Sequence, residues 1–177
     1  MKLFYIIKTD LSRLSAPTLK NFMKWYFSPR GSTFPHDVWL RVLQWSYEKK
    51  TRKFSIGIIA VLFYRHYSYK YGVHTNSHIN IGEGLKIVHG DGVHLNCSSI
   101  GSNFTVYQDV TFGVGKDGIP SVEDNVIVYP GAVIVGNITL HSGCIVGANA
   151  FVNKSVPSNA TVGGVPARIL HKSGEET

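Results

Sequence analysis

Histidine is the residue type in this chain that is best suited to chemistry at neutral pH, and the sequence contains eight. An imidazole can take a proton from a hydroxyl group near pH 7, so a histidine in a cleft can act as a general base. His89 has the most informative setting, because Gly90-Asp91-Gly92 follows it directly and breaks a regular pattern described below. We therefore predict that His89 is the catalytic residue.

Other histidines raise the question of a metal site. His94 lies five residues after His89, the spacing of two zinc-binding histidines in the β-helical carbonic anhydrases. His74, His78 and Asp91 could each supply a third ligand, but they match no metal-ligand pattern, so we expect no metal. His74, Asp91 and His94 are instead candidates for orienting His89 or lining its site, and His78 is either site-lining or surface. The histidines interpreted as structural or surface residues are His36, His141 and His171.

A six-residue repeat predicts the fold that must position these side chains. Apolar residues recur every sixth position at Ile81, Ile87 and Val93, then at Ile100, Val106 and Phe112, and then at Val122, Val128, Ile134, Leu140, Val146 and Val152. Four positions after the last series stand mostly small residues, namely Val126, Ala132, Ile138, Cys144, Ala150 and Val156. Three such hexads form one triangular turn of a parallel β-helix, and the turns must stack to bury their inner face.

Two stretches interrupt this repeat. Asp91 puts a charge at a position where the pattern expects a small inward residue. Between Phe112 and Val122 the spacing widens to ten residues, which predicts a protruding loop over 113–121. Irregularities on a regular scaffold are frequent places for function.

The first 72 residues have a different composition from the rest of the chain. They contain all three tryptophans, and apolar residues recur there at helical spacing. We predict about three helices, the last over roughly 54–70. The chain is therefore expected to be mainly β, with a helical subdomain over 1–72, a β-helix of about five coils over 73–169, and a C-terminal tail over 170–177.

Charge and hydropathy limit the partners. A net charge of +7 suits nucleic acid, an anionic membrane or a phosphorylated small ligand, but no nucleic-acid motif is present, so we expect no nucleic acid. The longest apolar stretch, 54–64, is about half of a bilayer span. No signal-peptide pattern occurs in residues 1–8, and the two cysteines suit a reducing cytoplasm. The aromatic and basic residues of 54–71 leave open a peripheral contact with the inner face of a membrane.

Three motifs make the chain similar to the hexapeptide-repeat acyltransferases, in the branch of serine acetyltransferases and bacterial polysaccharide O-acetyltransferases. They are Ile81-Gly82-Glu83-Gly84-Leu85 leading to His89, then Asp109-Val110-Thr111-Phe112-Gly113, and finally Gly163-Gly164-Val165-Pro166-Ala167-Arg168-Ile169. The resemblance covers residues 64–169 and implies a left-handed β-helix that assembles as a homotrimer. It also implies acetyl-CoA as the acyl donor, bound in a groove between neighbouring β-helices.

The same resemblance implies roles for individual residues. His89 matches the catalytic histidine, which takes the proton of a hydroxyl while that hydroxyl attacks the thioester carbonyl, with backbone N–H groups stabilising the oxyanion. The positions that match coenzyme A contacts are Gly113, Gly115, Lys116, Ala132, Ala150, Lys154 and Arg168. Among these, Lys116, Lys154 and Arg168 are expected to contact phosphate.

The chain departs from this family at four positions. His74 stands where the family has an acid that orients the catalytic histidine. Val88 replaces an Asp, and Gly118 with Ile119 replace an Arg-His pair, all of which bind the amino acid in serine acetyltransferases. We therefore expect the accepting hydroxyl to belong to a sugar or a surface polysaccharide. Serine O-acetylation and a non-catalytic β-helix scaffold are the alternatives.

Overall fold

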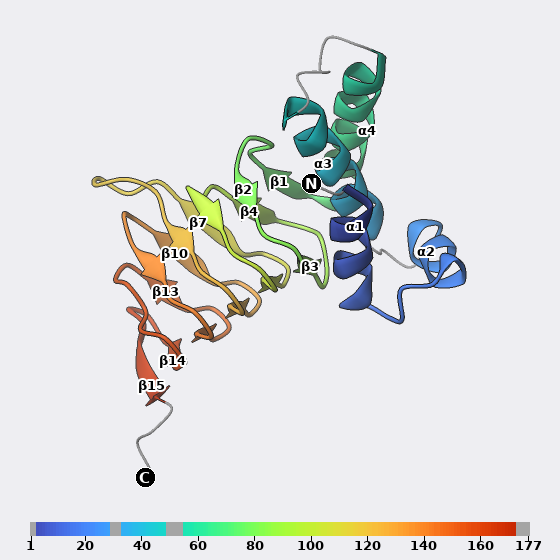
Figure 1. Cartoon of the computed structure of the whole chain (residues 1–177). Helices are drawn as coiled ribbons and strands as arrows, with labels where there is room; N and C mark the ends of the chain where they lie inside the picture. The colour runs from blue at the N-terminus through green and yellow to red at the C-terminus, as the bar shows by residue number, and fades with distance from the viewer. Residues whose placement is uncertain (1–2, 29–32, 49–54, 173–177) are drawn as a thin grey trace.

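A bundle of helices packs against one end of a parallel β-solenoid (Figure 1). The computed structural model describes residues 3–28, 33–48 and 55–172. The described helices are α1 (Leu3–Ser12), α2 (Leu19–Tyr26), α3 (Phe34–Glu48) and α4 (Ser55–Tyr71). There is one helix more than we expected, and the last lies close to the predicted range. No helix among the described residues is long and apolar enough to cross a bilayer.

The solenoid is built from short strands that return to the same face every third strand. The strands are β1 (Val73–Thr75), β2 (Asn80–Ile81), β3 (Lys86–Ile87), β4 (Val93–Leu95), β5 (Ser99–Ile100), β6 (Thr105–Val106), β7 (Thr111–Gly113), β8 (Ser121–Val122), β9 (Ile127–Val128), β10 (Val133–Val135), β11 (Thr139–Leu140), β12 (Ile145–Val146), β13 (Phe151–Val152), β14 (Ala160–Gly163) and β15 (Arg168–Lys172). Sheet A has the order β1-β4-β7-β10-β13, sheet B has β2-β5-β8-β11, and sheet C has β3-β6-β9-β12-β14-β15. Three successive strands therefore make one coil.

The side chains inside the solenoid are those that the six-residue repeat predicts. Every apolar residue of the three series, from Ile81 to Val152, is buried, as are the mostly small residues that follow the last series. Cys97 and Cys144 are buried free thiols, and burial raises the pKa of both, that of Cys144 to about 12. The predicted β-helix of about five coils is confirmed.

Asp91 does not face inward, contrary to what its place in the repeat suggested. Its side chain is exposed, and its φ of 59° puts the corner backbone in the left-handed region. Asp and Asn tolerate this conformation better than other non-glycine residues, so the corner turns through Asp91 and directs the carboxylate outward. The corner residues with the same conformation are Asn103, Asp109, Asn125, Asn149 and Asn159.

The helices close the N-terminal end of the solenoid. The first coil of a β-helix would otherwise expose an open core and a row of unpaired backbone groups. Leu40 of α3 is fully buried and belongs to the same core as the solenoid. The Thr33 hydroxyl donates to the Ile87 carbonyl at 2.7 Å, and the Tyr64 hydroxyl donates to the Thr75 carbonyl. The helical region thus acts as a cap on the first coil.

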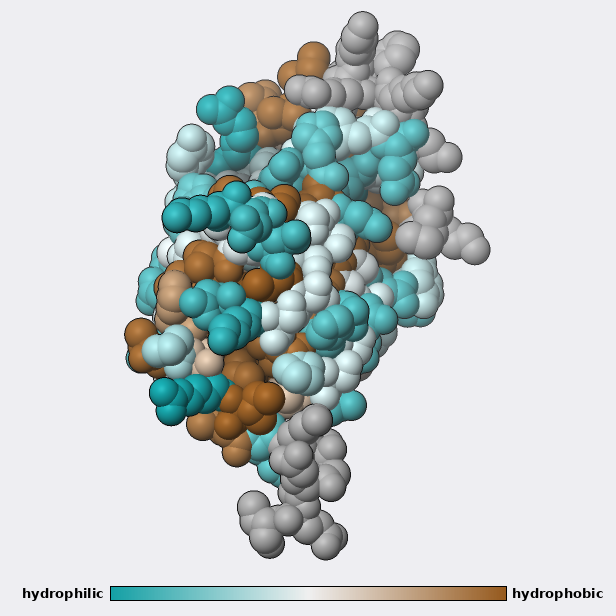
Figure 2. Space-filling view, turned by 90° about the vertical axis from the view of Figure 1, so that its left-hand side faces the viewer, coloured by the Kyte–Doolittle hydropathy of each residue, from teal (hydrophilic) through white to brown (hydrophobic). Residues whose placement is uncertain are grey.

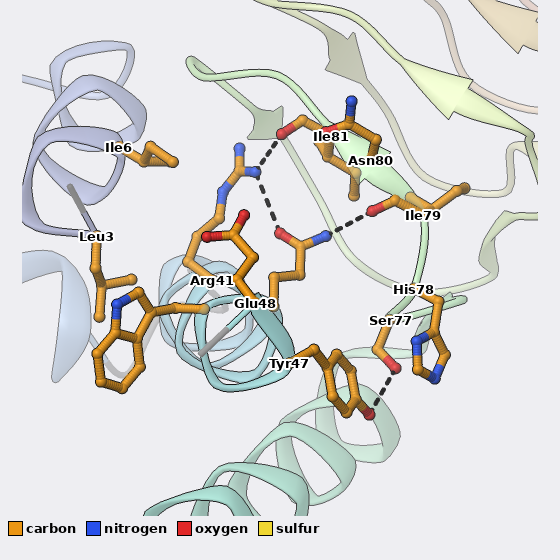
Figure 3. Close-up of a pocket in the computed structure, with 12 residues that line it drawn as sticks. Leu3, Ile6, Arg41, Tyr47, Glu48, Ser77, His78, Ile79, Asn80 and Ile81 are labelled. Carbon is orange, nitrogen blue, oxygen red and sulfur yellow. Dashed lines mark hydrogen bonds between the residues drawn. The ribbon is translucent and has the colours of Figure 1, made fainter. Parts of the chain in front are cut away.

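A buried ion pair lies at the centre of this cap. Nε of Arg41 and a carboxylate oxygen of Asp10 are 2.9 Å apart, and both side chains are 2% exposed. Arg41 also donates to the carbonyls of Ile81 and Gly82 at 2.7 and 2.6 Å (Figure 3 shows the first of these bonds). Asp10 accepts from the N–H groups of Gly84 and the residue after it at 2.7 and 2.9 Å. Burial raises the pKa of Asp10, and Arg41 opposes that shift.

The opposite end of the solenoid is closed by β15, which pairs antiparallel with β14. The connection between these strands contains a cis peptide bond at Val165–Pro166. Because of this pairing, β15 continues past Ile169, where we expected the β-helix to end. The fold therefore has a helical cap at one end and a short hairpin at the other.

Candidate functional site

His89 lies exposed at the corner between β3 and β4, and the end of α4 fixes that corner. The N–H of Asp91 donates to the Tyr71 carbonyl at 2.6 Å. Gly90 packs against the same carbonyl so closely that a Cβ there would lie 2.1 Å from its oxygen. Only glycine fits such an approach, so the interruption of the repeat is the place where α4 docks. This contact gives the His89 corner a rigid backbone.

The imidazole of His89 has no hydrogen-bond partner among residues 3–28, 33–48 and 55–172. The Asp91 carboxylate is exposed, and neither His74 nor His94 bonds to His89 in the described part of the chain. The proposed orienting role of His74, Asp91 or His94 therefore remains a prediction. A bound acceptor or a neighbouring chain could supply the orienting group.

His74 and His94 pair with each other on the outer face of sheet A. They are register partners in β1 and β4, and their rings stack with centroids 4.8 Å apart and planes 19° apart. Burial lowers the pKa of His74, and the neighbouring His94 lowers it further. An imidazole, whether neutral or protonated, cannot supply the negative charge of the acid that the family has at this position. The two rings line a shallow groove of about 250 Å³ with Thr75, Asn76, Leu95 and Asn96.

The loop after β7 protrudes from the solenoid, at the left of Figure 1. Its base is a tight hairpin, in which the N–H of Gly115 donates to the Gly118 carbonyl at 2.8 Å. Gly115 lies against the next coil, where a Cβ would be 2.5 Å from Cα of Gly136. Gly113 ends β7 and pairs with Val135, and Lys116 is exposed in the loop. Gly115 therefore allows the loop to pack closely on the next coil, and Lys116 presents a cation to solvent.

Ala132 and Ala150 lie directly before β10 and β13, and both side chains are buried. Their carbonyls accept from the N–H groups of Thr111 and Val133 at 3.0 and 2.8 Å. These carbonyls are committed to the sheet. The N–H of Ala150 donates to the Gly147 carbonyl at 3.4 Å. A contact between acetyl-CoA and Ala132 would therefore come through the Ala132 N–H group.

Lys154 and Arg168 are both exposed at the C-terminal end of the solenoid. Lys154 borders a groove of about 190 Å³ together with Pro157, Ala167 and Ile169. The N–H of Ala167 donates to the Phe151 carbonyl at 2.8 Å, which places the start of β15 beside β13. The contact of Lys154 and Arg168 with phosphate remains a prediction.

Several predicted site residues lie at the two edges of sheet A, whereas His74 and His94 lie within its strands and Arg168 begins β15 of sheet C. His89, Ala132 and Ala150 precede strands of this sheet, whereas the loop and Lys154 follow strands of it. Parallel strands all begin at one edge of a sheet and end at the other. A single chain therefore does not bring His89 together with the loop.

A separate pocket of about 270 Å³ lies between α1, α3 and β2 (Figure 3). Gln44 donates to the Ile79 carbonyl at 2.9 Å, and the Tyr47 and Ser77 hydroxyls are 3.3 Å apart. His78 stacks on Tyr47 with ring centroids 4.4 Å apart. These polar groups already bond to the first coil, so we assign the pocket and His78 to the cap.

Sequence reasoning missed Asp10, Arg41 and Tyr71, which connect the helices to the first coil. Arg41 stands among apolar residues of its helix, and an isolated charge in such a place often has a buried partner. Asp10 lies close to Lys8 and Arg13 in the sequence and gives no such signal. The signal at Arg41 indicates a buried pair without identifying its other member. Tyr71 acts through its carbonyl, which has no sequence signal.

Known proteins share both the repeat and the fold. A family model described as "Bacterial transferase hexapeptide (six repeats)" matches residues 120–154. A serine acetyltransferase of Staphylococcus xylosus is 36% identical over 144 residues, which cover 78% of this chain and 65% of that protein. The chain spans between half and two thirds of the curated relatives that it matches.

Solved structures extend the likeness over the helices. The serine acetyltransferase of Brucella abortus strain S19 gives a TM-score of 0.79 at 26% identity, covering 98% of this chain and 70% of that one. The complex of the Brucella abortus strain S19 enzyme with coenzyme A gives a TM-score of 0.75 at 26% identity, covering 98% of this chain and 69% of that one. These proteins are named for serine and not for the sugar acceptor that we expected. By repeat, fold and relatives, the chain is similar to the hexapeptide-repeat acyltransferases, and the relatives and structures named above are serine acetyltransferases.

Proposed function

We propose that this protein is an acetyl-CoA-dependent O-acetyltransferase in which His89 is the general base. The observation that carries the proposal is the likeness of nearly the whole chain to serine acetyltransferases, one of them solved with coenzyme A. The exposed imidazole on a rigid corner supports it, because a general base must reach a substrate hydroxyl and hold its position.

The chemistry is a direct transfer. The acceptor hydroxyl gives its proton to the His89 imidazole while its oxygen attacks the thioester carbonyl of acetyl-CoA. The tetrahedral intermediate collapses, the carbon–sulfur bond breaks, and the coenzyme A sulfur leaves with the proton from the imidazolium. Backbone N–H groups at the corners, such as that of Ala132, are suitable hydrogen-bond donors to an amide carbonyl of acetyl-CoA or to the oxyanion.

The donor is proposed to lie between two chains. His89 and the two alanines occupy one edge of sheet A, and the loop with Lys116 occupies the other. A neighbouring copy could place its loop beside the His89 edge, which would complete the site. The separation of the two edges thus supports the homotrimer that the family resemblance implies.

Serine is the first candidate acceptor, because the curated relatives and the structural neighbours are named serine acetyltransferase. A sugar hydroxyl is the second candidate, and specific side chains favour it. Val88, beside the catalytic histidine, is apolar and half-buried. Gly118 has a φ of 135°, so an arginine at that position would strain the loop. The site thus lacks charged groups at the positions that bind the amino acid in serine acetyltransferases.

One assay tests the reaction and separates these acceptors. Purified protein is given acetyl-CoA with L-serine, or with a panel of mono- and oligosaccharides, and free coenzyme A and the acetylated product are measured. We expect turnover with one class only and a loss of about a thousandfold in His89→Ala. His141→Ala, which changes a histidine bonded to Glu123 at 3.0 Å, is the matched control and should retain activity. Turnover that survives in His89→Ala would exclude His89 as the base.

Calorimetry tests the donor site independently of the acceptor. Coenzyme A is titrated into wild type, into Lys154→Ala/Arg168→Ala, and into Lys20→Ala/Lys24→Ala, which removes the same charge from α2. We expect the first pair to weaken binding by about tenfold or more and the control pair to have little effect. No binding by folded wild type would contradict the acetyltransferase proposal and favour the scaffold alternative.

A further inference from the structure

The two regions of the chain differ sharply in charge. Residues 1–72 contain 13 Lys and Arg against three Asp and Glu, a formal charge of +10, whereas residues 73–177 contain five against eight, a charge of −3. Asp10 and Asp37 are buried, which leaves Glu48 as the exposed acid in the described part of this region. Its exposed cations in the structure are Lys8, Lys20, Lys24, Arg65 and Lys70. The described surface of the helical cap thus carries five exposed cations against one exposed acid.

An apolar patch lies on the outer face of the first half of α4. We call it the α4 patch, and it consists of Ile56, Ile58, Ile59, Leu62 and Phe63, whose side chains are between 43% and 62% exposed. The opposite face of the helix packs inward through Gly57, Ala60 and Ser68. Apolar surface reaches the upper end of the molecule in Figure 2, the level at which α4 begins in Figure 1. Contiguous apolar surface of this kind marks an interaction site.

Aromatic contacts connect the α4 patch to α2. Phe63 stacks on Trp39 with ring centroids 4.4 Å apart, and Nε1 of Trp39 donates to the Tyr26 hydroxyl at 2.8 Å. The ring of Tyr26 in turn contacts that of Phe27, with centroids 5.0 Å apart, and Phe27 is 66% exposed. A chain of aromatic contacts therefore connects the α4 patch to the exposed Phe27 at the end of α2. Rigid aromatic side chains with satisfied polar groups are typical of protein surfaces that meet the interface of a bilayer.

Cations follow the apolar residues on the same helix. Beyond Phe63, the outer face of α4 presents Arg65, His66, Tyr69 and Lys70, all exposed. Nζ of Lys70 lies over the ring of Tyr71, 5.2 Å from its centroid, and the residue is exposed at the surface. The helix thus presents an apolar half followed by a cationic half, which is the arrangement that binds an anionic lipid surface.

We propose that the helical cap docks on an anionic membrane surface through the α4 patch. The apolar side chains of α4 enter the boundary between headgroups and acyl chains, and the surrounding cations contact the lipid phosphates. Charge complementarity selects this occupant, because the +10 of residues 1–72 would oppose the docking of a second copy of the same face. The inference is independent of the proposed acetyl transfer, since it depends on the cap alone.

Vesicle co-sedimentation of the full chain tests the proposal. The protein is mixed with vesicles of phosphatidylcholine alone, or of an equimolar mixture of phosphatidylcholine and phosphatidylglycerol, and the bound fraction is measured at low and high salt. We expect binding to the anionic vesicles, weakened by salt, and little binding to phosphatidylcholine. Ile58→Gln/Leu62→Gln should lower the partition coefficient by about tenfold or more.

A matched variant controls for general loss of apolar surface. Val165→Gln/Leu170→Gln changes two side chains that are 76% and 69% exposed at the other end of the molecule, and it should bind like wild type. Circular dichroism verifies that both variants remain folded. Failure of wild type to bind anionic vesicles, or equal losses in the two variants, would overturn the proposal. The proposal would also be overturned if wild type bound no vesicles and Ile58→Gln/Leu62→Gln formed a smaller oligomer than wild type. The α4 patch would then be an interface between copies of this chain.

Discussion

The helical cap and the β-helix are stabilised by contacts of different range. In the β-helix each strand pairs with the strand of the next coil, as Val133 does with Phe151, and the same inward residue types recur at every hexad. In the cap, Asp10 bonds to the N–H of Gly84, which is 74 residues away, and to Arg41, which is 31 residues away. The difference indicates that the β-helix is encoded locally and repeatedly, whereas the position of the cap depends on a few distant polar contacts.

This difference has a consequence for the site. The β-helix supplies the residues proposed to bind the donor, and these stand on regular strands and corners. The His89 corner is the exception, because the end of α4 holds it through the Tyr71 carbonyl. Disturbing the cap should therefore affect His89, whereas disturbing a single coil far from the cap should not.

Removal of the buried cation should have the largest effect on the cap. Arg41→Met leaves the Asp10 carboxylate buried without its partner and removes two bonds to first-coil carbonyls. We expect a loss of about 3–5 kcal/mol in the free energy of unfolding, measured by urea titration. Arg65→Met changes an exposed arginine on α4 and should cost about 0.5 kcal/mol or less.

The double variant Arg41→Met/Asp10→Leu sharpens this test. It removes the unpaired charge along with its partner, so it should be more stable than the sum of the two single changes implies. A cost below about 1 kcal/mol for Arg41→Met alone would mean that the ion pair does not anchor the cap.

The same comparison explains what the sequence could predict. The hexad pattern is local, so it predicted the β-helix, its buried residues and its protruding loop correctly. The prediction that Asp91 points inward was wrong. α4 docks at that corner, and the hexad pattern gives no information about the position of the helix. The pairing of His74 with His94 depends on strand register one coil apart, which the spacing of two histidines does not show. Asp10 and Arg41 come together only in the folded cap.

The pH dependence of stability should have the next largest effect, and we expect it to arise in the helical cap. Asp37 in the cap is buried, which raises its pKa from 3.8 to about 6, while the hydrogen bond from His36 partly opposes the shift. A carboxyl with a raised pKa in the folded state contributes stability that is complete below pH 3.8 and is lost as the pH rises through 6. We therefore expect the stability of the cap to fall by about 2–3 kcal/mol across this window.

Asp37→Asn should flatten that pH dependence, as measured by thermal unfolding followed through tryptophan fluorescence, since all three tryptophans lie in residues 1–72. Some slope should persist, because burial also raises the pKa of Asp10. An unchanged slope in Asp37→Asn would assign the pH dependence to other groups.

Two substitutions distinguish the effect of the backbone at the His89 corner from the effect of the Asp91 charge. Gly90→Ala puts a Cβ at 2.1 Å from the Tyr71 carbonyl oxygen, so the corner or the end of α4 must move. We expect a cost of about 2 kcal/mol and a marked loss of acetyl transfer. Asp91→Asn is the matched control, because asparagine keeps the left-handed conformation while the carboxylate is lost. If Asp91→Asn loses as much activity as Gly90→Ala, then Asp91 itself orients His89.

Corner substitutions in the β-helix should have the smallest effect, and they test whether this region is encoded locally. Asn103 has a φ of 58°, and its Nδ2 donates to Oδ1 of Asn125 in the next coil at 3.1 Å. Asn103→Ala places a Cβ in the left-handed region and should cost about 1 kcal/mol or slightly more in urea unfolding. Asn103→Gly loses the same side-chain bond without that strain and should cost about 0.5 kcal/mol or less. If both variants lost equally, the side-chain ladder and not the backbone conformation would set the corner, and neighbouring coils would then be coupled in the way that the cap is coupled to the first coil.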